Sequence, residues 1–228
     1  MRLLLLLVLA FTSVTGAQEK PPRVATSFYC FQYAPGLEDV FVRTGAKAFQ
    51  KIELSTANMI GPVSIVSIDG VVTVHRQDTD EDGNMIYPVA GTAKVSGGVS
   101  KPLVLLLPGG EQAGYRTLVM DRSNARFPMG SYQFVNLARF PVRGLIGKTP
   151  VAVRSGGVSN IKPAGDPGEM VTVLFEYNDG TRWRTMTKTR WAIRDDRRTL
   201  MCSYVDPRTQ RVKLRSIPER LVPAEPQP

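Results

Sequence analysis

Apolar residues recur at every second position along most of this chain, and Gly, Pro, Asn and Asp separate the alternating runs. A period of two is typical of β-strands with one buried face, whereas an amphipathic helix repeats at about 3.6 residues. The clearest run, residues 181–193, alternates strictly. Helical patterning is weak, because residues 45–55 would give only a turn or two and fit a strand as well. The sequence therefore predicts an all-β protein.

Turn signals at regular intervals favour many short antiparallel strands. Asp69-Gly70 and Asn178-Asp179-Gly180 are strong hairpin signals. Such a pattern predicts an antiparallel β-sandwich. The last four strands, at residues 170–177, 181–193, 199–205 and 211–217, are expected to form an antiparallel meander. Either one domain spans residues 24–218, or two packed β subdomains meet near residues 108–114. No internal sequence repeat is evident.

The two ends of the chain carry no strand pattern. Arg2, an apolar run at residues 3–11 and the small residues 15–17 are typical of a secretory signal peptide. This run is shorter than the about 20 residues that cross a bilayer, and no later segment is long and apolar enough. We expect a signal peptide at residues 1–17, a linker at 18–23, and a soluble mature chain that is exported to the periplasm or beyond the cell. The proline-rich residues 219–228 are predicted to be a disordered tail.

The mature chain contains two cysteines, Cys30 and Cys202. An exported protein can join such a pair in a disulfide, and the long loop would give a stabilisation of roughly 5 kcal/mol. Two buried thiols that never meet are an equally good interpretation.

Catalytic motifs are scarce. The one histidine, His75, lies in a strand-like stretch, and no serine lies in a Gly-x-Ser-x-Gly turn. The pairs Glu38-Asp39 and Asp195-Asp196 would point to opposite faces of a strand, so they are poor partners for acid–base chemistry. No phosphate-binding loop is present. The sequence therefore favours a non-catalytic protein over an enzyme.

The acidic stretch DTDEDGN, residues 78–84, is the best metal candidate. Asp78, Asp80, Asp82 and Gly83 follow the first half of a helix-loop-helix calcium loop, but Val89 stands where the bidentate glutamate belongs. The flanks also lack helical pattern, which excludes that motif. A looser calcium site on Asp78, Asp80 and Asp82 is one hypothesis. The favoured interpretation is a solvated hairpin tip, and no other cofactor is indicated.

The positive charge is concentrated near the C-terminus. Residues 18–180 hold 16 basic and 15 acidic residues, whereas residues 181–220 hold 12 basic and 4 acidic. Alternation predicts that Trp183 and Trp191 point into the core and that basic residues share the other face. If the strands expected at residues 181–193 and 211–217 lie in one sheet with these faces aligned, they form a broad basic surface. The residues of this predicted surface are Arg182, Arg184, Lys188, Arg190, Arg211, Lys213 and Arg215.

Three functional hypotheses follow. The leading one is an exported, non-catalytic β protein that binds an anionic envelope polymer or lipid head groups through the basic C-terminal sheet. The alternative is a carbohydrate- or ligand-binding β-sandwich module, and the least favoured is an exported hydrolase. Nucleic acid is a weak candidate partner, because the predicted core position of both tryptophans leaves no stacking platform. The sequence predicts no oligomeric state.

Overall fold

A computed structural model describes residues 21–109, 114–206 and 208–220 of the chain. Within these residues all regular structure is β-strand, which confirms the predicted all-β sandwich class. The described part contains no helix of the length and apolar character that a bilayer crossing requires. The predicted signal peptide, residues 18–20 of the predicted linker and residues 221–228 of the predicted tail lie outside the described residues.

The first half of the chain forms an N-terminal sandwich of two four-stranded sheets. Its inner sheet has the strand order β10-β9-β1-β4 and its outer sheet the order β3-β2-β5-β8. The strands are β1 (Arg23–Cys30), β2 (Asp39–Arg43), β3 (Phe49–Glu53), β4 (Ile60–Val66), β5 (Val71–His75), β8 (Val89–Lys94), β9 (Pro102–Pro108) and β10 (Tyr115–Asp121). A separate hairpin of β6 (Asp78–Thr79) and β7 (Met85–Ile86) lies between β5 and β8.

The second half forms a C-terminal sandwich, again of two four-stranded sheets. Its inner sheet has the order β14-β11-β17-β18 and its outer sheet the order β13-β12-β15-β16. The strands are β11 (Tyr132–Asn136), β12 (Val142–Ile146), β13 (Thr149–Val153), β14 (Val158–Ile161), β15 (Met170–Asn178), β16 (Trp183–Ala192), β17 (Arg197–Val205) and β18 (Val212–Arg220).

The two sandwiches have the same topology, although no repeat is evident in the sequence. In each inner sheet the first strand pairs in parallel with the seventh and antiparallel with the fourth, if the β6–β7 hairpin is left out of the count. In each outer sheet, with the same count, the second strand pairs antiparallel with the third and the fifth, and the fifth pairs antiparallel with the sixth. The strands β8 and β10 therefore correspond to β16 and β18. The β6–β7 hairpin stands where the C-terminal sandwich has only the tight turn between β15 and β16.

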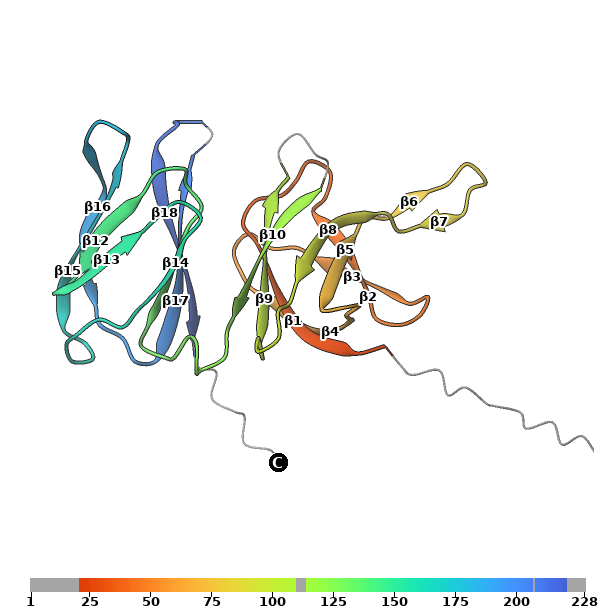
Figure 1. Cartoon of the computed structure of the whole chain (residues 1–228), viewed down its shortest axis with the longest axis horizontal. Coiled ribbons are helices and arrows are strands. Elements are labelled where there is room, and N and C mark those ends of the chain that lie inside the picture. The colour runs from red at the N-terminus through yellow and green to blue at the C-terminus, as the bar shows by residue number, and fades with distance from the viewer. Residues whose placement is uncertain (1–20, 110–113, 207, 221–228) are drawn as a thin grey trace, which may run out of the picture.

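The four sheets stack as four layers with three apolar cores between them, and the two inner sheets face each other (Figure 1). Phe28, Val40 and Leu106 belong to the core of the N-terminal sandwich, and Phe134 and Phe175 to that of the C-terminal sandwich. The third core joins the sandwiches and includes Tyr29, Leu105, Val135, Leu200 and Ile217. Burial of so much apolar side chain between the inner sheets holds the two halves together.

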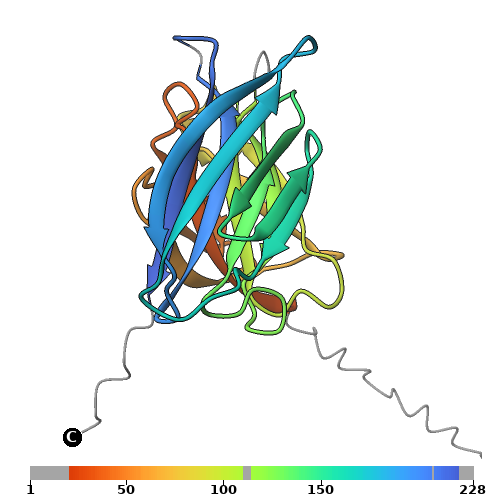
Figure 2. The same ribbon diagram turned by 90° about the vertical axis from the view of Figure 1, so that its left-hand side faces the viewer.

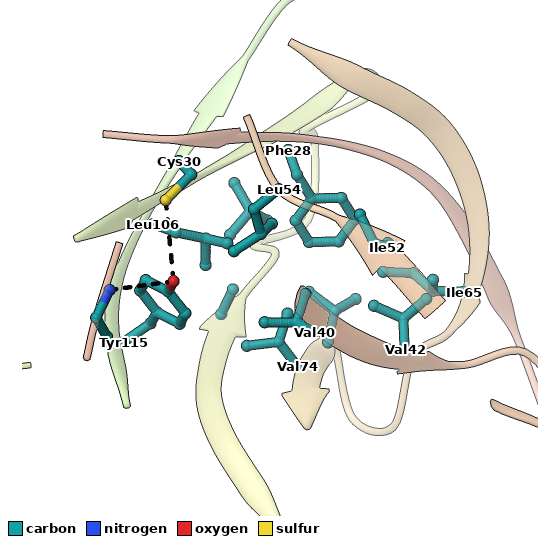
Figure 3. Close-up of a cluster of buried hydrophobic side chains, with 14 residues drawn as sticks. Phe28, Cys30, Val40, Val42, Ile52, Leu54, Ile65, Val74, Leu106 and Tyr115 are labelled. Atoms are coloured by element: carbon teal, nitrogen blue, oxygen red, sulfur yellow. Dashed lines mark hydrogen bonds between the residues drawn. The ribbon is translucent and has the colours of Figure 1, made fainter. Parts of the chain in front are cut away.

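Figure 3 shows how the N-terminal core accommodates a polar group. The hydroxyl of Tyr115 donates to the carbonyl oxygen of Leu37 at 2.5 Å and accepts from the backbone N–H of Ala34 at 3.2 Å. The thiol of Cys30 points at the same oxygen at 3.9 Å. Because these partners satisfy the hydroxyl, β10 can place a tyrosine in the core without an orphaned donor.

A partly buried ionic cluster adds a second link between the halves. Glu219 on β18 pairs with Arg198 on β17 and with Arg122, which follows β10. Arg122 also donates to the hydroxyl of Ser27 on β1 at 2.9 Å, and Arg198 donates to the carbonyl oxygen of Phe127 at 2.7 Å. Burial would raise the pKa of Glu219, but its hydrogen bonds to Arg198 and Arg122 outweigh burial and lower it. The carboxylate therefore stays ionised between two arginines.

The structure differs from several sequence expectations in which sheet each strand joins and where the strands end. The Asp69-Gly70 turn forms, with both residues at positive φ, but β4 and β5 then part and enter different sheets. The last four strands form two antiparallel hairpins, and these also lie in different sheets. The segment near residues 108–114 connects β9 and β10 within one sheet, and its residues 110–113 lie outside the described residues. Glu219 and Arg220, assigned to the tail by sequence, belong to β18.

Candidate anion-binding edge

The two basic strands lie at the same edge of the C-terminal sandwich but in different sheets. β16 is the edge strand of the outer sheet, and β18 is the edge strand of the inner sheet. Figure 2 shows both strands along one side of the sandwich, with β16 nearer the viewer. The broad one-sheet surface expected from the sequence therefore does not form. The structure instead places the basic residues around a narrow edge. We call it the basic edge, and it comprises β16, β18 and the turns at the ends of these strands.

A β-bulge divides the basic stripe of β16. The pairing with β15 shifts at Met186, so Phe175 lies opposite Thr187 whereas Glu176 lies opposite Thr185. The extra residue reverses the alternation along the strand. Lys188 and Arg190 consequently share the outer face, and Arg184, opposite the buried Tyr177, lies on the inner face.

The bulge also separates the two tryptophans that the sequence placed together in the core. Trp191 packs against the core beside Tyr132, with ring centroids 5.6 Å apart. Trp183 lies opposite Asn178, and the guanidinium of Arg143 lies 4.0 Å from the centre of its ring. The predicted core position is confirmed for Trp191. It is wrong for Trp183, because the bulge reverses the alternation between the two tryptophans.

The basic face of β18 is directed toward the N-terminal sandwich. Arg215 lies opposite Cys202 of the inter-sandwich core, donates to the carbonyl oxygen of Phe31 at 2.5 Å, and stacks on the Phe31 ring at 4.4 Å. Lys213 pairs with Asp206, and that hydrogen bond lowers the pKa of Asp206 to about 2. Arg215 therefore helps to join the sandwiches and is not part of an open binding face.

Three arginines meet at the end of the edge where the β15–β16 and β17–β18 turns lie. Arg182 and Arg184 come from the first hairpin, and Arg211 precedes β18 in the second. They line one hollow of about 410 Å³, here called the turn-end hollow. Its other lining residues are Tyr177, Trp183 and Thr185.

Only one of these three arginines is neutralised within the described residues. Arg184 is hydrogen-bonded to Asp179, which holds the pKa of that carboxyl well below its usual range. The same carboxylate caps the turn by accepting from the backbone N–H groups of Thr181 and Arg182. No ion pair or side-chain hydrogen bond engages the guanidinium groups of Arg182 and Arg211 in the described part of the chain. Two charged groups thus remain available to a ligand.

A second hollow of about 410 Å³ lies at the other end of the edge, and we call it the far-end hollow. Arg190, Arg194 and Arg197 line it together with the stacked Tyr132 and Trp191. Its further lining residues are Ala192, Thr199, Ser216 and Pro218. Sequence reasoning did not propose Arg194 and Arg197 as site residues, although the run RDDRR at residues 194–198 signalled them. Asp196 pairs with both arginines, and its pKa is lowered by Arg194 first and by Arg197 as well.

The corresponding edge of the N-terminal sandwich is closed. A Cβ on Gly91 of β8 would lie 2.9 Å from the carbonyl oxygen of Tyr115, and one on Gly114 only 2.3 Å from that of Ala90. The hydroxyl of Thr117 on β10 donates to the carbonyl oxygen of Thr92 on β8 at 2.5 Å. Glycine thus lets the two edge strands touch, whereas large side chains line the gap between β16 and β18.

The three aspartates of the calcium hypothesis lie along the β6–β7 hairpin. Asp80 accepts hydrogen bonds from the backbone N–H groups of Asp82 and Asn84 at 3.1 and 2.7 Å. Asp78 accepts from the N–H of Thr79 and pairs with Arg76. The described residues contain no group of three or more acidic, histidine or cysteine side chains placed to hold a metal ion. The geometry supports the favoured interpretation, in which these side chains organise a turn.

His75 lies at the base of the same hairpin. Its Nδ1 is 2.8 Å from the carbonyl oxygen of Tyr87, so this nitrogen carries the hydrogen. Its Nε2 is buried and has no hydrogen-bond partner within the described residues. The ring packs edge-on against Phe49 at 5.1 Å. Among the described residues, neither Asp78 nor a serine is hydrogen-bonded to the imidazole, so no Ser-His-Asp arrangement forms around His75 in this part of the chain.

Cys30 and Cys202 are both free and buried. Cys30 belongs to the core of the N-terminal sandwich and Cys202 to the core between the sandwiches. Burial raises the pKa of both thiols, to about 12 for Cys202. Two buried thiols in different layers are therefore observed instead of a disulfide.

Comparison with known proteins adds no assignment: no protein-family model and no curated protein matches the chain. The function has to be inferred from the molecule itself.

Proposed function

We propose that the chain is an exported, non-catalytic binding protein whose basic edge attaches it to an anionic polymer or to lipid head groups of the cell envelope. The proposal rests above all on Arg182 and Arg211, which converge on one hollow from two different hairpins without a carboxylate partner in the described residues. Arginine is suited to this role because its planar guanidinium binds phosphate, sulfate or carboxylate through two parallel hydrogen bonds.

The spacing of the two hollows favours an extended ligand over a small anion. They lie toward opposite ends of β16, which has ten residues. At about 3.3 Å per residue, the strand spans roughly 30 Å. Lys188 lies between the two hollows on the outer face, and Arg190, which lines the far-end hollow, shares that face. A polymer or a charged surface can contact all these cations at once, whereas a single phosphate can reach only one hollow.

Nucleic acid is a less suitable ligand. Sequence-tolerant nucleic-acid binding uses exposed aromatic rings on which bases stack. Trp191 stacks on Tyr132 and packs against the core, and the ring of Trp183 has Arg143 over it. The predicted export of the chain also separates it from genomic nucleic acid.

Binding to heparin and to vesicles that contain phosphatidylglycerol provides the test. We expect retention that falls as salt is added, because surface charges are screened within about 10 Å at 0.1 M salt. Each arginine near an anionic surface contributes about 1 kcal/mol. The double variant R182E/R211E should therefore bind at least about 30-fold more weakly.

A matched double variant keeps the overall charge change the same. Arg23 and Lys94 are exposed and belong to the N-terminal sandwich. R23E/K94E should bind almost as well as the unchanged protein. Equal weakening in both variants would show that only net charge matters, and unchanged binding in R182E/R211E would overturn the proposal.

The groove between the sandwiches supports a second candidate, the binding of a small carbohydrate or another neutral ligand. It encloses about 640 Å³ and is lined by Phe31, Leu107, Leu118, Leu137 and Tyr204, among others. Mixed aromatic and polar linings of this size are typical of ligand sites. Glycan-array binding that persists at high salt and is lost in L118W would favour this role. Binding that disappears at high salt would assign the signal to the basic edge.

A further inference from the structure

The β6–β7 hairpin, residues 76–88, is an insertion that the C-terminal sandwich lacks, and we call it the acidic arm. Figure 1 shows it extending away from the sheets at the end of the molecule opposite to β16. Its strands are only two residues long and pair only with each other. A two-stranded hairpin gains little stability in water by itself. The arm is therefore an exposed projection whose two strands join none of the four sheets.

The base of the arm is well anchored, whereas its outer part is exposed. Tyr87 stacks on Phe49, with centroids 4.1 Å apart, and lies 5.2 Å from Phe41. Beyond this base, Met85 is 59% exposed and Ile86 is 37% exposed. Apolar side chains gathered on an exposed projection indicate a surface that contacts another molecule. A fixed base also directs the tip and limits the entropy lost on docking.

The arm and the basic edge have opposite charge. Asp78, Asp80, Glu81 and Asp82 lie within five consecutive positions of the arm. Asp80 accepts hydrogen bonds within the turn, and Asp78 pairs with Arg76. No described side chain pairs with Glu81 or Asp82. The basic edge presents the unpaired Arg182 and Arg211 and the exposed Lys188. Complementary potentials of this kind steer association and fix orientation.

The basic edge also offers a free sheet edge. β16 pairs with β15 on one side and is the last strand of its sheet in the described residues. Unpaired backbone groups along such a strand are ready to accept another extended segment. In the N-terminal sandwich, contact between β8 and β10 closes the equivalent edge. Of these two equivalent edges, the one formed by β16 is thus the one open to strand addition in the described residues.

We propose that the chain assembles head to tail, with the acidic arm of one copy docked on the basic edge of the next. Because the arm and the edge lie at opposite ends of the long axis, each copy can use both at once, and the contact is heterologous. Glu81 and Asp82 of the arm meet Arg182 and Arg211 of the edge, and the contact removes the exposed Met85 and Ile86 from water. The inference rests on the same basic edge as the proposed function, with a second copy as one of its anionic ligands.

Sedimentation velocity over a range of concentrations tests the assembly. At low ionic strength, the average mass should rise with concentration, and added salt or heparin should reverse the rise. E81K/D82K changes the arm and leaves Asp80 to organise the turn, and R182E/R211E changes the edge. Each variant alone should associate at least tenfold more weakly, and thermal melts should show that both remain folded.

The mixture of the two variants is the decisive sample. An acidic arm from R182E/R211E can then dock on the basic edge of E81K/D82K, so association should return. A mixture that stays monomeric, or an unchanged protein that stays monomeric at every concentration, overturns the inference. Heparin binding separates the two proposals: E81K/D82K should retain it, so loss of self-association leaves the proposed function intact.

Discussion

In the N-terminal sandwich the edge strands β8 and β10 touch, whereas the corresponding strands β16 and β18 of the C-terminal sandwich leave two arginine-lined hollows between them. The topology of the two sandwiches is the same. Gly91 and Gly114 permit contact at one edge, and Trp191, Arg184 and their neighbours separate the strands at the other. The same sandwich topology can therefore have a closed edge or an edge open to ligands, and a few residues on the edge strands decide which of the two forms.

The largest expected effect concerns the contact that makes the two sandwiches one body. Glu219→Ala removes the shared partner of Arg122 and of Arg198, whose side chain is only 7% exposed. Because Glu219 is itself 23% exposed, the expected cost is about 3 kcal/mol, the lower end of the range for breaking a fully buried ion pair. Chemical denaturation should show this loss. A transition that separates into two steps would show that the sandwiches now unfold apart, and a loss below about 1 kcal/mol would contradict the buried-pair account.

The second prediction opens the closed edge. Gly114→Ala places a Cβ 2.3 Å from the carbonyl oxygen of Ala90 at a backbone φ of +117°. Strain and the forced separation of β8 from β10 should together lower the free energy of unfolding by about 2–4 kcal/mol. Gly97→Ala is the matched control, because no atom lies within 4 Å of its added Cβ. Equal stability of the two variants would mean that glycine does not close this edge.

A third prediction concerns acid stability. The pKa of Glu219 is lowered from its usual 4.5, so the unfolded chain binds this proton more readily than the folded one. Its stabilising contribution is complete above pH 4.5 and is lost as the pH falls through the lowered folded pKa. The melting temperature of Glu219→Gln should therefore fall less steeply in acid than that of the unchanged protein. Parallel curves would assign acid sensitivity to other carboxylates.

The smallest expected effect concerns the bulge. Trp183→Leu removes the contact with the Arg143 guanidinium on the outer face, which should reduce stability by about 0.5–1 kcal/mol. Trp191→Leu, which alters a side chain packed against the core, should reduce it by more. Thermal denaturation of the two variants measures the difference. If Trp183→Leu were the more destabilising change, the bulge would not separate the tryptophans as described.

Local patterns predicted much of the secondary structure. The turns at Asp69-Gly70 and Asp179-Gly180 form where turn chemistry places them. The same patterns did not reveal which sheet receives each strand. β4 and β5 share a turn and then separate, because the buried faces of β4 and β5 pack from opposite sheets onto the same core. The alternation of β16 was also interrupted by one extra residue, Met186, whose effect depends on pairing with β15.

The amino-acid sequence by itself determined the all-β class, the turns and the concentration of positive charge near the C-terminus, because these follow from period-two alternation, turn chemistry and composition. Only the tertiary structure decided that the chain forms two sandwiches of one topology, that Arg215 and Glu219 join them, and that Arg182 meets Arg211 at one hollow. The reason is physical: sheet membership and edge closure depend on contacts between residues far apart in the chain, and local periodicity carries no information about which strands will meet.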